Sequence, residues 1–298
     1  MVFYKSDTAM LHYLKDVIDR FANESRPNLH NNISITWIHY PHKNPKSGSG
    51  IGAGWSENKL FYPASVVKVI YGIATELWLR KDLILESKEL RRALSDMLSE
   101  SSNDATSYII DLLTGTNSGV SLSGNNWQAW KKQRQLINLW LKSLNWPELT
   151  QVNCCQKTWS EGPYGRDKDF YGDSNENRNA LTTAAIGRIF ESLMTGNLLS
   201  TDRTKNLKGY LSRHLELHWR KSNPENQVDG FLGAHLPSSA KLWSKAGLMS
   251  EVRHDVAWWH VPEASPMLLA VFCEGKELSK DEFLLPAIGK ALNEFSFT

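Results

Sequence analysis

The sequence predicts an α+β fold, an α/β sandwich in which an antiparallel sheet of about five strands is flanked by N- and C-terminal helices. Two observations carry this prediction. Strand-like runs lie near both ends of the 298-residue chain, and helical periodicity dominates the region between them. We therefore expect the two ends to build one sheet, with an all-helical domain inserted between them.

The N-terminal elements follow from periodicity. Apolar residues recur at helical spacing near the N-terminus, so a first helix is expected to end near Asn23. A strand over 33–40, a Pro/Gly turn and a second strand over 51–55 form a hairpin. The next helix, 62–80, is apolar nearly all round, which is typical of a helix buried on every side. Further helices are expected at 88–99, 103–113, 126–144, 182–195 and 201–220.

The C-terminal third is rich in strands. Runs at 241–248, 253–261 and 266–274 are separated by short turns, and a last helix is expected over about 284–295. The predicted domains are a sheet domain from both chain ends, 1–56 with 196–298, and a helical domain, 57–195.

Composition excludes several classes of protein. The chain has 34 Lys and Arg against 32 Asp and Glu, a net charge of +2, so nucleic acid is not an expected partner. No apolar run approaches the roughly 18 residues of a membrane span, and the N-terminus lacks the continuous apolar stretch of a signal peptide. Three cysteines cannot form a disulfide framework. We expect a cytoplasmic monomer that does not bind membranes.

The helix over 62–80 begins with Pro-Ala-Ser-x-x-Lys, which places Ser65 and Lys68 one turn apart on one face. A serine hydroxyl is a weak nucleophile until a base lies within hydrogen-bond distance. Burial lowers the pKa of a lysine, because the charged form loses its hydration, and the neutral amine is a base. The same spacing occurs at Ser56–Lys59, in a turn, and at Ser238–Lys241, before a strand, so the spacing alone is a weak signal.

Two further motifs follow in order along the chain. Ser101-x-Asn103 lies between two expected helices, and Lys245-x-Gly247 lies in an expected strand. The ordered set Ser-x-x-Lys, Ser-x-Asn and Lys-x-Gly is the signature of class A β-lactamases and penicillin-binding proteins. The chain resembles class A β-lactamases over most of its length. The resemblance implies the β-lactamase-like fold and a serine hydrolase that forms an acyl-enzyme.

The resemblance implies a role for each motif residue in acylation. Ser65 is the acylated nucleophile, Lys68 is the base or proton shuttle beside it, and Ser101 passes a proton to the leaving nitrogen. The backbone N–H groups of Ser65 and of Leu248, which follows Gly247, form the oxyanion hole.

The resemblance also implies substrate-binding residues. Asn103 holds the side-chain amide of the substrate, and Lys245 supplies positive potential for a substrate carboxylate. Arg253 lies close to where some family members carry a carboxylate-binding arginine. One residue departs from the family, which has Thr or Ser where this chain has Ala246. That hydroxyl normally contacts the substrate carboxylate, and losing such a hydrogen bond costs about 1.5–3 kcal/mol.

The family's glutamate motif for deacylation, Glu-Pro-Glu-Leu-Asn, is missing from the corresponding stretch, 158–179. Counting back from Arg178 by the family's interval gives the position where the glutamate is expected, and this chain has Arg166 there, which is not an acid. Glu161 is the first expected substitute, with Asp167 and Asp169 behind it. The alternative for all three is a solvated charge on a loop. Without a placed base, hydrolysis of the acyl-enzyme is expected to be slow.

We therefore expect an enzyme that hydrolyses a β-lactam or a related amide and needs no metal or organic cofactor. The expected partner is a small-molecule amide or ester substrate. Two alternatives remain: an esterase or peptidase that acts on another amide or ester, and a penicillin-binding or sensor module that acylates without efficient turnover.

Three other patterns are interpreted as structural. Aromatic and basic residues are mixed between Trp127 and Lys142, but their apolar positions fit one helix face better than a nucleic-acid-binding surface. His214 and His218 are four residues apart without an evident third metal ligand. Cys154-Cys155 is interpreted as a pair of buried thiols.

Overall fold

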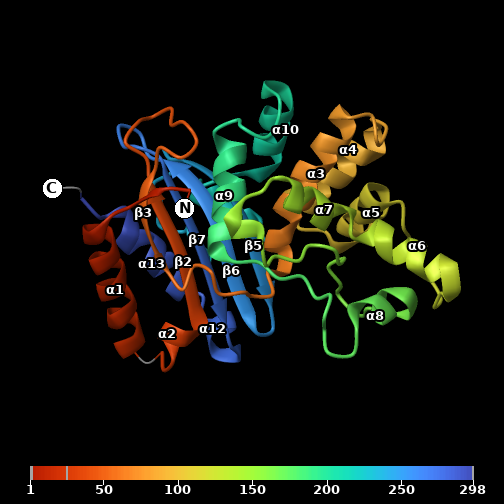
Figure 1. Cartoon of the computed structure of the whole chain (residues 1–298). Coiled ribbons are helices and arrows are strands. Elements are labelled where there is room, and N and C mark those ends of the chain that lie inside the picture. The colour runs from red at the N-terminus through yellow and green to blue at the C-terminus, as the bar shows by residue number, and fades with distance from the viewer. Residues whose placement is uncertain (1–2, 25, 297–298) are drawn as a thin grey trace.

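A seven-stranded sheet lies at the centre of the computed structural model, which describes residues 3–24 and 26–296. The strand order is β1-β3-β2-β7-β6-β5-β4, and helices cover both faces (Figure 1). All neighbouring strands are antiparallel except β1 and β3. The strands are β1 (Lys5–Ser6), β2 (Ile33–His39), β3 (Ile51–Trp55), β4 (Ser212–Arg213), β5 (Lys241–Met249), β6 (Val252–His260) and β7 (Met267–Glu274).

The helices separate into those that cover the sheet and those of the inserted region. None within the described ranges combines the length and the apolar character that a membrane span needs. The helices are α1 (Thr8–Asn23), α2 (Leu29–Asn32), η1 (Ala64–Val67), α3 (Lys68–Arg80), α4 (Lys88–Leu98), α5 (Asn103–Thr114), α6 (Gly124–Arg134), α7 (Leu136–Ser143), η2 (Pro147–Leu149), α8 (Gly165–Tyr171), α9 (Thr183–Met194), α10 (Thr201–Leu211), α11 (Leu217–Ser222), α12 (Lys276–Lys280) and α13 (Leu284–Asn293).

The two ends of the chain build one sheet, as predicted. In the middle of the sheet β2 pairs with β7 along its whole length, from Ile33 opposite Cys273 to His39 opposite Met267. Helices α1 and α13 pack on one face and bury an apolar cluster against it. Helix α1 begins at an Asp7 cap, whose carboxylate accepts from the N–H of Met10 at 2.8 Å, because free N–H groups at a helix start need acceptors.

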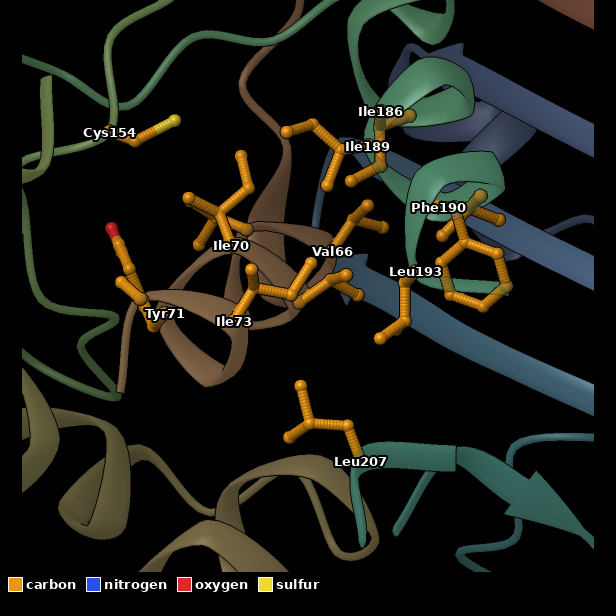
Figure 2. Packing of buried hydrophobic residues seen from close by; sticks show 14 of the residues in the cluster. Val66, Ile70, Tyr71, Ile73, Cys154, Ile186, Ile189, Phe190, Leu193 and Leu207 are labelled. Carbon is orange, nitrogen blue, oxygen red and sulfur yellow. The ribbon is translucent and has the colours of Figure 1, made fainter. Parts of the chain in front are cut away.

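The opposite face of the sheet packs against α9, and α3 lies beyond it. Figure 2 shows Ile70 and Ile73 of α3 facing Ile189 and Leu193 of α9. Helix α3 is buried on almost every side, as its apolar sequence predicts. The core is continuous from the sheet through α9 to α3, and the predicted domain boundaries, residues 56 and 195, stay a prediction.

Two predicted elements are corrected by the structure. The sheet has seven strands rather than about five, because β1 and β4 add two residues each at its edges. Strands this short carry no readable alternation of apolar and polar residues. The single helix predicted over 201–220 ends at Leu211, where β4 pairs with β5. The helix predicted over 126–144 is two helices, α6 and α7, separated at Gln135.

Candidate active site

Ser65 lies in the 3-10 turn η1, which continues into α3. Val66 and Val67 on the same turn are fully buried and fix it against the core. Ala64 has a φ of 45°, a left-handed conformation that costs an L-residue roughly 1–2 kcal/mol. Such strain persists where the surrounding structure holds it, and it is common at functional sites.

Strand β5 approaches the Ser65 turn so closely that only glycine fits at position 247. A Cβ on Gly247 would lie 2.8 Å from the carbonyl oxygen of Pro63 and 3.1 Å from the backbone nitrogen of Ser65. Alternate residues of a strand direct their backbone groups to the same edge. The N–H of Ala246 donates to Gln227 Oε1, and the N–H of Leu248 therefore points to the same edge of β5.

His254 on β6 ties this turn to the sheet. Its Nε2 lies 2.9 Å from the carbonyl oxygen of Tyr62, and its Nδ1 accepts from the N–H of Cys273 at 3.1 Å. Because Nδ1 accepts, Nε2 carries the proton and donates. Complete burial lowers the pKa of His254 to about 4, so the ring is neutral at neutral pH.

Lys68 is fully buried at the first turn of α3. Its Nζ donates to the carbonyl oxygen of Ser101 at 2.5 Å, to Ser101 Oγ at 3.2 Å and to Asn103 Oδ1 at 2.8 Å. Burial lowers the pKa of Lys68 to about 7, because the ammonium form loses hydration. The neutral amine, which can accept a proton, is therefore populated near neutral pH.

Ser101 stands between α4 and α5 with a φ of 61°. The next residue, Ser102, holds the turn: its N–H donates to the carbonyl oxygen of Asp96 at 2.9 Å, and its hydroxyl caps α5 by accepting from Ala105. This left-handed turn brings both the carbonyl and the hydroxyl oxygen of Ser101 within hydrogen-bond distance of Lys68.

Lys245 reaches the same hydroxyl from β5. Its Nζ donates to Ser101 Oγ at 3.0 Å, to Gln227 Oε1 at 2.7 Å and to the carbonyl oxygen of Ala246 at 2.9 Å. Burial lowers the pKa of Lys245 well below its ordinary value, and the charges of Lys68 and Arg213 lower it further. The structure thus brings together residues from three distant segments around one hydroxyl.

Two residues of this cluster were not identified from the sequence. Gln227 accepts from Lys245 and from the N–H of Ala246, and its Nε2 donates to the carbonyl oxygen of Ser99 at 2.7 Å. Arg213 donates to the carbonyl oxygens of Leu98 at 3.0 Å and Ser244 at 2.8 Å. Both residues join the segment before Ser101 to β5. A single Gln in a polar loop and an Arg in an expected helix carry no sequence signal.

Hydroxyl groups, rather than a carboxylate, contact Asn103 from the stretch that replaces the glutamate motif. Thr158 Oγ1 donates to Asn103 Oδ1 at 2.8 Å, and Asn103 Nδ2 donates to Ser160 Oγ at 3.2 Å. Glu161 is exposed, and within the described ranges no hydrogen bond joins its carboxylate to Lys68 or Asn103.

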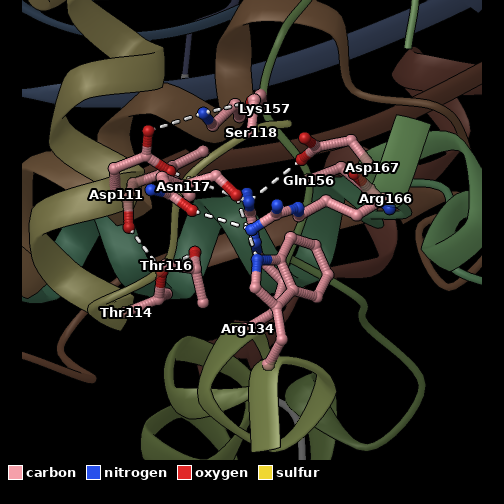
Figure 3. A network of polar contacts seen from close by, with 12 residues as sticks. Asp111, Thr114, Thr116, Asn117, Ser118, Arg134, Gln156, Lys157, Arg166 and Asp167 are labelled. Carbon is pink, nitrogen blue, oxygen red and sulfur yellow. Dashed lines mark hydrogen bonds and ion pairs between the residues drawn. The ribbon is translucent and has the colours of Figure 1, made fainter. Parts of the chain in front are cut away.

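The other two acids of this stretch lie elsewhere. Asp167 is fully buried and pairs with the equally buried Arg134 at 2.9 Å (Figure 3). Figure 3 also shows Lys157 beside Asp111, which it contacts at 2.7 Å. These pairs fasten the stretch to α5 and α6. Asp169 is exposed.

A cavity of about 540 Å³ opens beside the cluster. Ser65, Ser101, Ala246 and Leu248 line it, together with Arg253. The Arg253 side chain is buried, and its Nε and Nη1 donate to backbone carbonyl oxygens at 2.9 and 3.1 Å. This volume accommodates a small organic molecule next to the Ser65 hydroxyl.

The residues that were interpreted as structural lie in the protein interior or contact neighbouring rings. Cys154 and Cys155 are buried, as predicted. Trp127 and Trp130 stack on each other with centroids 5.6 Å apart. The ring of His214 packs against the ring of Trp219, with centroids 4.7 Å apart.

Comparison with known proteins agrees with this fold. A family model described as the β-lactamase enzyme family matches residues 85–295, which include the Ser101 and Lys245 motifs and begin after Ser65. No curated protein matches the sequence. Among solved structures, a β-lactamase from Sphaerobacter thermophilus is similar at a TM-score of 0.64 and 16% identity, over 96% of this chain and 99% of that chain.

Two further structures have the same fold. A β-lactamase from Chitinophaga pinensis is similar at a TM-score of 0.65 and 14% identity, over 94% of this chain and 97% of that chain. PBP-A is similar at a TM-score of 0.61 and 13% identity, over 99% and 100%. At these identities the similarity establishes the fold, and the chemistry has to be argued from the side chains of this chain.

Proposed function

The chain belongs to the β-lactamase enzyme family, and from this we propose that it is a serine hydrolase that forms an acyl-enzyme at Ser65 and hydrolyses a β-lactam or a related amide. The observation that carries the proposal is the convergence of Lys68 and Lys245 on Ser101 Oγ, beside the cavity that Ser65 lines. Lys68, three residues after Ser65, is a buried lysine of lowered pKa, and it is the base that we assign to nucleophilic attack by Ser65.

In the proposed acylation step, neutral Lys68 accepts the hydroxyl proton as Ser65 Oγ bonds to the substrate carbonyl carbon. The N–H groups of Ser65 and Leu248 stabilise the negative charge that develops on the carbonyl oxygen. The C–N bond then breaks, and Ser101 Oγ gives its proton to the leaving nitrogen. Lys68 or Lys245, both within 3.2 Å of Ser101 Oγ, returns a proton to that oxygen.

Hydrolysis of the acyl-enzyme needs a base that activates water. Glu161 in this role stays a prediction. From the stretch that replaces the glutamate motif, the hydroxyls of Thr158 and Ser160 contact Asn103, and a hydroxyl is not a base at neutral pH. We therefore propose that deacylation limits turnover in this enzyme.

The test is time-resolved intact mass spectrometry of the protein mixed with a penicillin. We expect one adduct that forms on wild type, is absent in Ser65→Ala, and clears slowly. The matched controls are Ser56→Ala and Ser238→Ala, which remove the other two serines with the same spacing to lysine and leave the adduct unchanged. An adduct that never clears indicates a penicillin-binding or sensor module, and no adduct rejects a β-lactam as substrate.

A further inference from the structure

Gln227 joins the two segments that meet at the Ser101 hydroxyl. Its side-chain oxygen accepts from Lys245 Nζ at 2.7 Å and from the backbone N–H of Ala246 at 3.2 Å, both on β5. Its Nε2 donates to the carbonyl oxygen of Ser99, just after α4, at 2.7 Å. One amide group therefore contacts the sheet with its oxygen and the segment before Ser101 with its nitrogen.

The contacts of Gln227 fix which way its amide points. Besides Lys245 and Ala246, Nη2 of Arg213 donates to the same oxygen at 3.4 Å. If the amide were turned around, its NH2 group would face these donors, and the carbonyl oxygen of Ser99 would face the amide oxygen. The hydrogen-bond network thus assigns the oxygen to the side of β5.

The loop that carries Gln227 is held on both sides of this residue. Before it, Asn226 Oδ1 accepts from the N–H groups of Val228 at 3.0 Å and of Asp229 at 2.9 Å, which closes a turn. After it, Val228 is fully buried in the apolar cluster that α1 and α13 form against the sheet. The Gln227 side chain therefore reaches Lys245 from a fixed point of the backbone.

The Lys245 ammonium has three protons, and within the described chain each of them has an acceptor. These are Ser101 Oγ at 3.0 Å, Gln227 Oε1 at 2.7 Å and the carbonyl oxygen of Ala246 at 2.9 Å. Lys245 is fully buried, so bulk water does not replace an acceptor that is lost. The shortest of the three hydrogen bonds is the one to Gln227.

The charges that act on Lys245 come from three other elements. Burial lowers its pKa most, the charges of Lys68 on α3 and Arg213 on β4 lower it further, and Asp255 on β6 raises it. Burial also raises the pKa of Asp255 to about 7, so this carboxylate is not fully charged near neutral pH. Gln227 is a neutral acceptor that favours the ammonium form where burial and two cations oppose it.

We propose that Gln227 is a positioning residue for acylation: its amide oxygen keeps Lys245 charged and directs the ammonium at Ser101 Oγ. The inference rests on the proposed function, because it adds a residue to the same step. When Ser101 Oγ gives its proton to the leaving nitrogen, negative charge develops on that oxygen, and the ammonium 3.0 Å away stabilises it. Gln227 acts through Lys245 and exchanges no proton itself.

The experiment measures the rate at which a penicillin acylates Ser65 between about pH 5.5 and pH 10, by rapid mixing and intact mass. We expect the rate to rise as Lys68 becomes neutral and to fall again where Lys245 loses its proton. The two limbs belong to a coupled pair of lysines, so the fall has to be assigned by a variant. Lys245→Arg, whose side chain stays charged, is expected to lack the fall at high pH.

Two substitutions of Gln227 move this fall in opposite directions. Gln227→Glu places a carboxylate against the ammonium, and an opposite charge at this distance moves the fall upward by about 1–3 pH units. Gln227→Met keeps the length of the side chain without the acceptor and moves the fall downward by about one pH unit. The matched controls, Gln128→Glu and Gln128→Met, make the same changes at an exposed position of α6 and leave the profile unchanged.

A residue that only braces the loop, or that only contacts the substrate, gives a different result. In either case both variants slow acylation at every pH and leave the fall where it is in wild type, which overturns the inference. A wild-type profile without the fall, or a fall that persists in Lys245→Arg, overturns it as well. If Gln227→Met does not fold, Gln227→Glu decides alone, because only a charge that acts on Lys245 moves the fall upward. These outcomes leave the proposed function standing, whereas a wild-type protein that forms no Ser65 adduct at any pH overturns both.

Discussion

Lys68 and Lys245 share one hydrogen-bond partner: their ammonium nitrogens lie 3.2 and 3.0 Å from Oγ of Ser101. Two buried ammonium groups on one hydroxyl disfavour each other's charge, and the charge of Lys68 contributes to the lowered pKa of Lys245. Near neutral pH the two lysines are therefore not both fully protonated, and Ser101 can exchange a proton with either of them.

The rate at which a penicillin acylates Ser65 is expected to rise with pH through about 7. Lys68 acts in its neutral form, which predominates above its pKa of about 7, so below that pH the rate falls about tenfold per pH unit. Rapid-mixing measurements of adduct formation between pH 5.5 and 8.5 give the profile. Lys68→Arg, which keeps the charge but cannot lose the proton, is the control and loses the rise. A flat wild-type profile contradicts Lys68 as the base.

Ser160→Glu is expected to accelerate clearing of the acyl-enzyme by about 100-fold, because it places a carboxylate where the Ser160 hydroxyl now contacts Asn103. The measurement is the decay of the Ser65 adduct by intact mass after excess penicillin is removed. Glu161→Gln is the companion variant. If it slows decay by a similar factor in an otherwise wild-type chain, Glu161 is the base that activates water.

Asp167→Ala is expected to lower the free energy of unfolding by about 3–5 kcal/mol, because it leaves the buried Arg134 without its closest anionic partner. Urea denaturation followed by circular dichroism gives this value. Asp169→Ala removes an exposed carboxylate from the same helix and is expected to change stability by less than about 0.5 kcal/mol. Equal losses in the two variants would contradict the structural role of Asp167.

The stabilisation provided by neutral His254 is expected to disappear as pH falls from about 6.5 to 4. The pKa of His254 is lowered to about 4 in the folded chain and is about 6.5 when unfolded, so its contribution is complete above 6.5 and falls by about 3 kcal/mol in that window. Asp255 has the opposite effect on the free energy of unfolding as pH falls, because burial raises its pKa to about 7. Urea unfolding of wild type and His254→Gln at each pH isolates the histidine, since Asp255 cancels in the difference. A constant difference contradicts the prediction.

Most of the sheet and of the long helices could be predicted, because periodicity reports on burial. Strands β2, β3, β5, β6 and β7 and helix α1 lie where their patterns place them. The misplaced elements depend on tertiary contacts. The helix expected over 201–220 breaks at β4, where Arg213 reaches the carbonyl oxygens of Leu98 and Ser244, and nothing local in the sequence indicates those partners.

Some residues of the candidate site could likewise be predicted from the sequence, and others could not. The spacing and order of Ser65, Lys68, Ser101 and Lys245 predict a candidate site. In the structure Lys68 and Lys245 both contact Ser101 Oγ, and Ser65 and Ser101 line one cavity. Gln227 has no such spacing, although it supplies the acceptor that holds the Lys245 ammonium.

The pairing of β2 with β7 has a consequence for the synthesis of the chain. The β2–β3 hairpin is made before most of the chain, but the central partner of β2 is β7, the last of the described strands in chain order. Until β7 arrives, β2 presents an unpaired edge that carries Ile33, Ile35, Trp37 and Ile38, which is a risk for aggregation. We therefore expect the nascent chain to need chaperone protection for most of its translation, and the Ser65 site to become active only after the C-terminal strands are released.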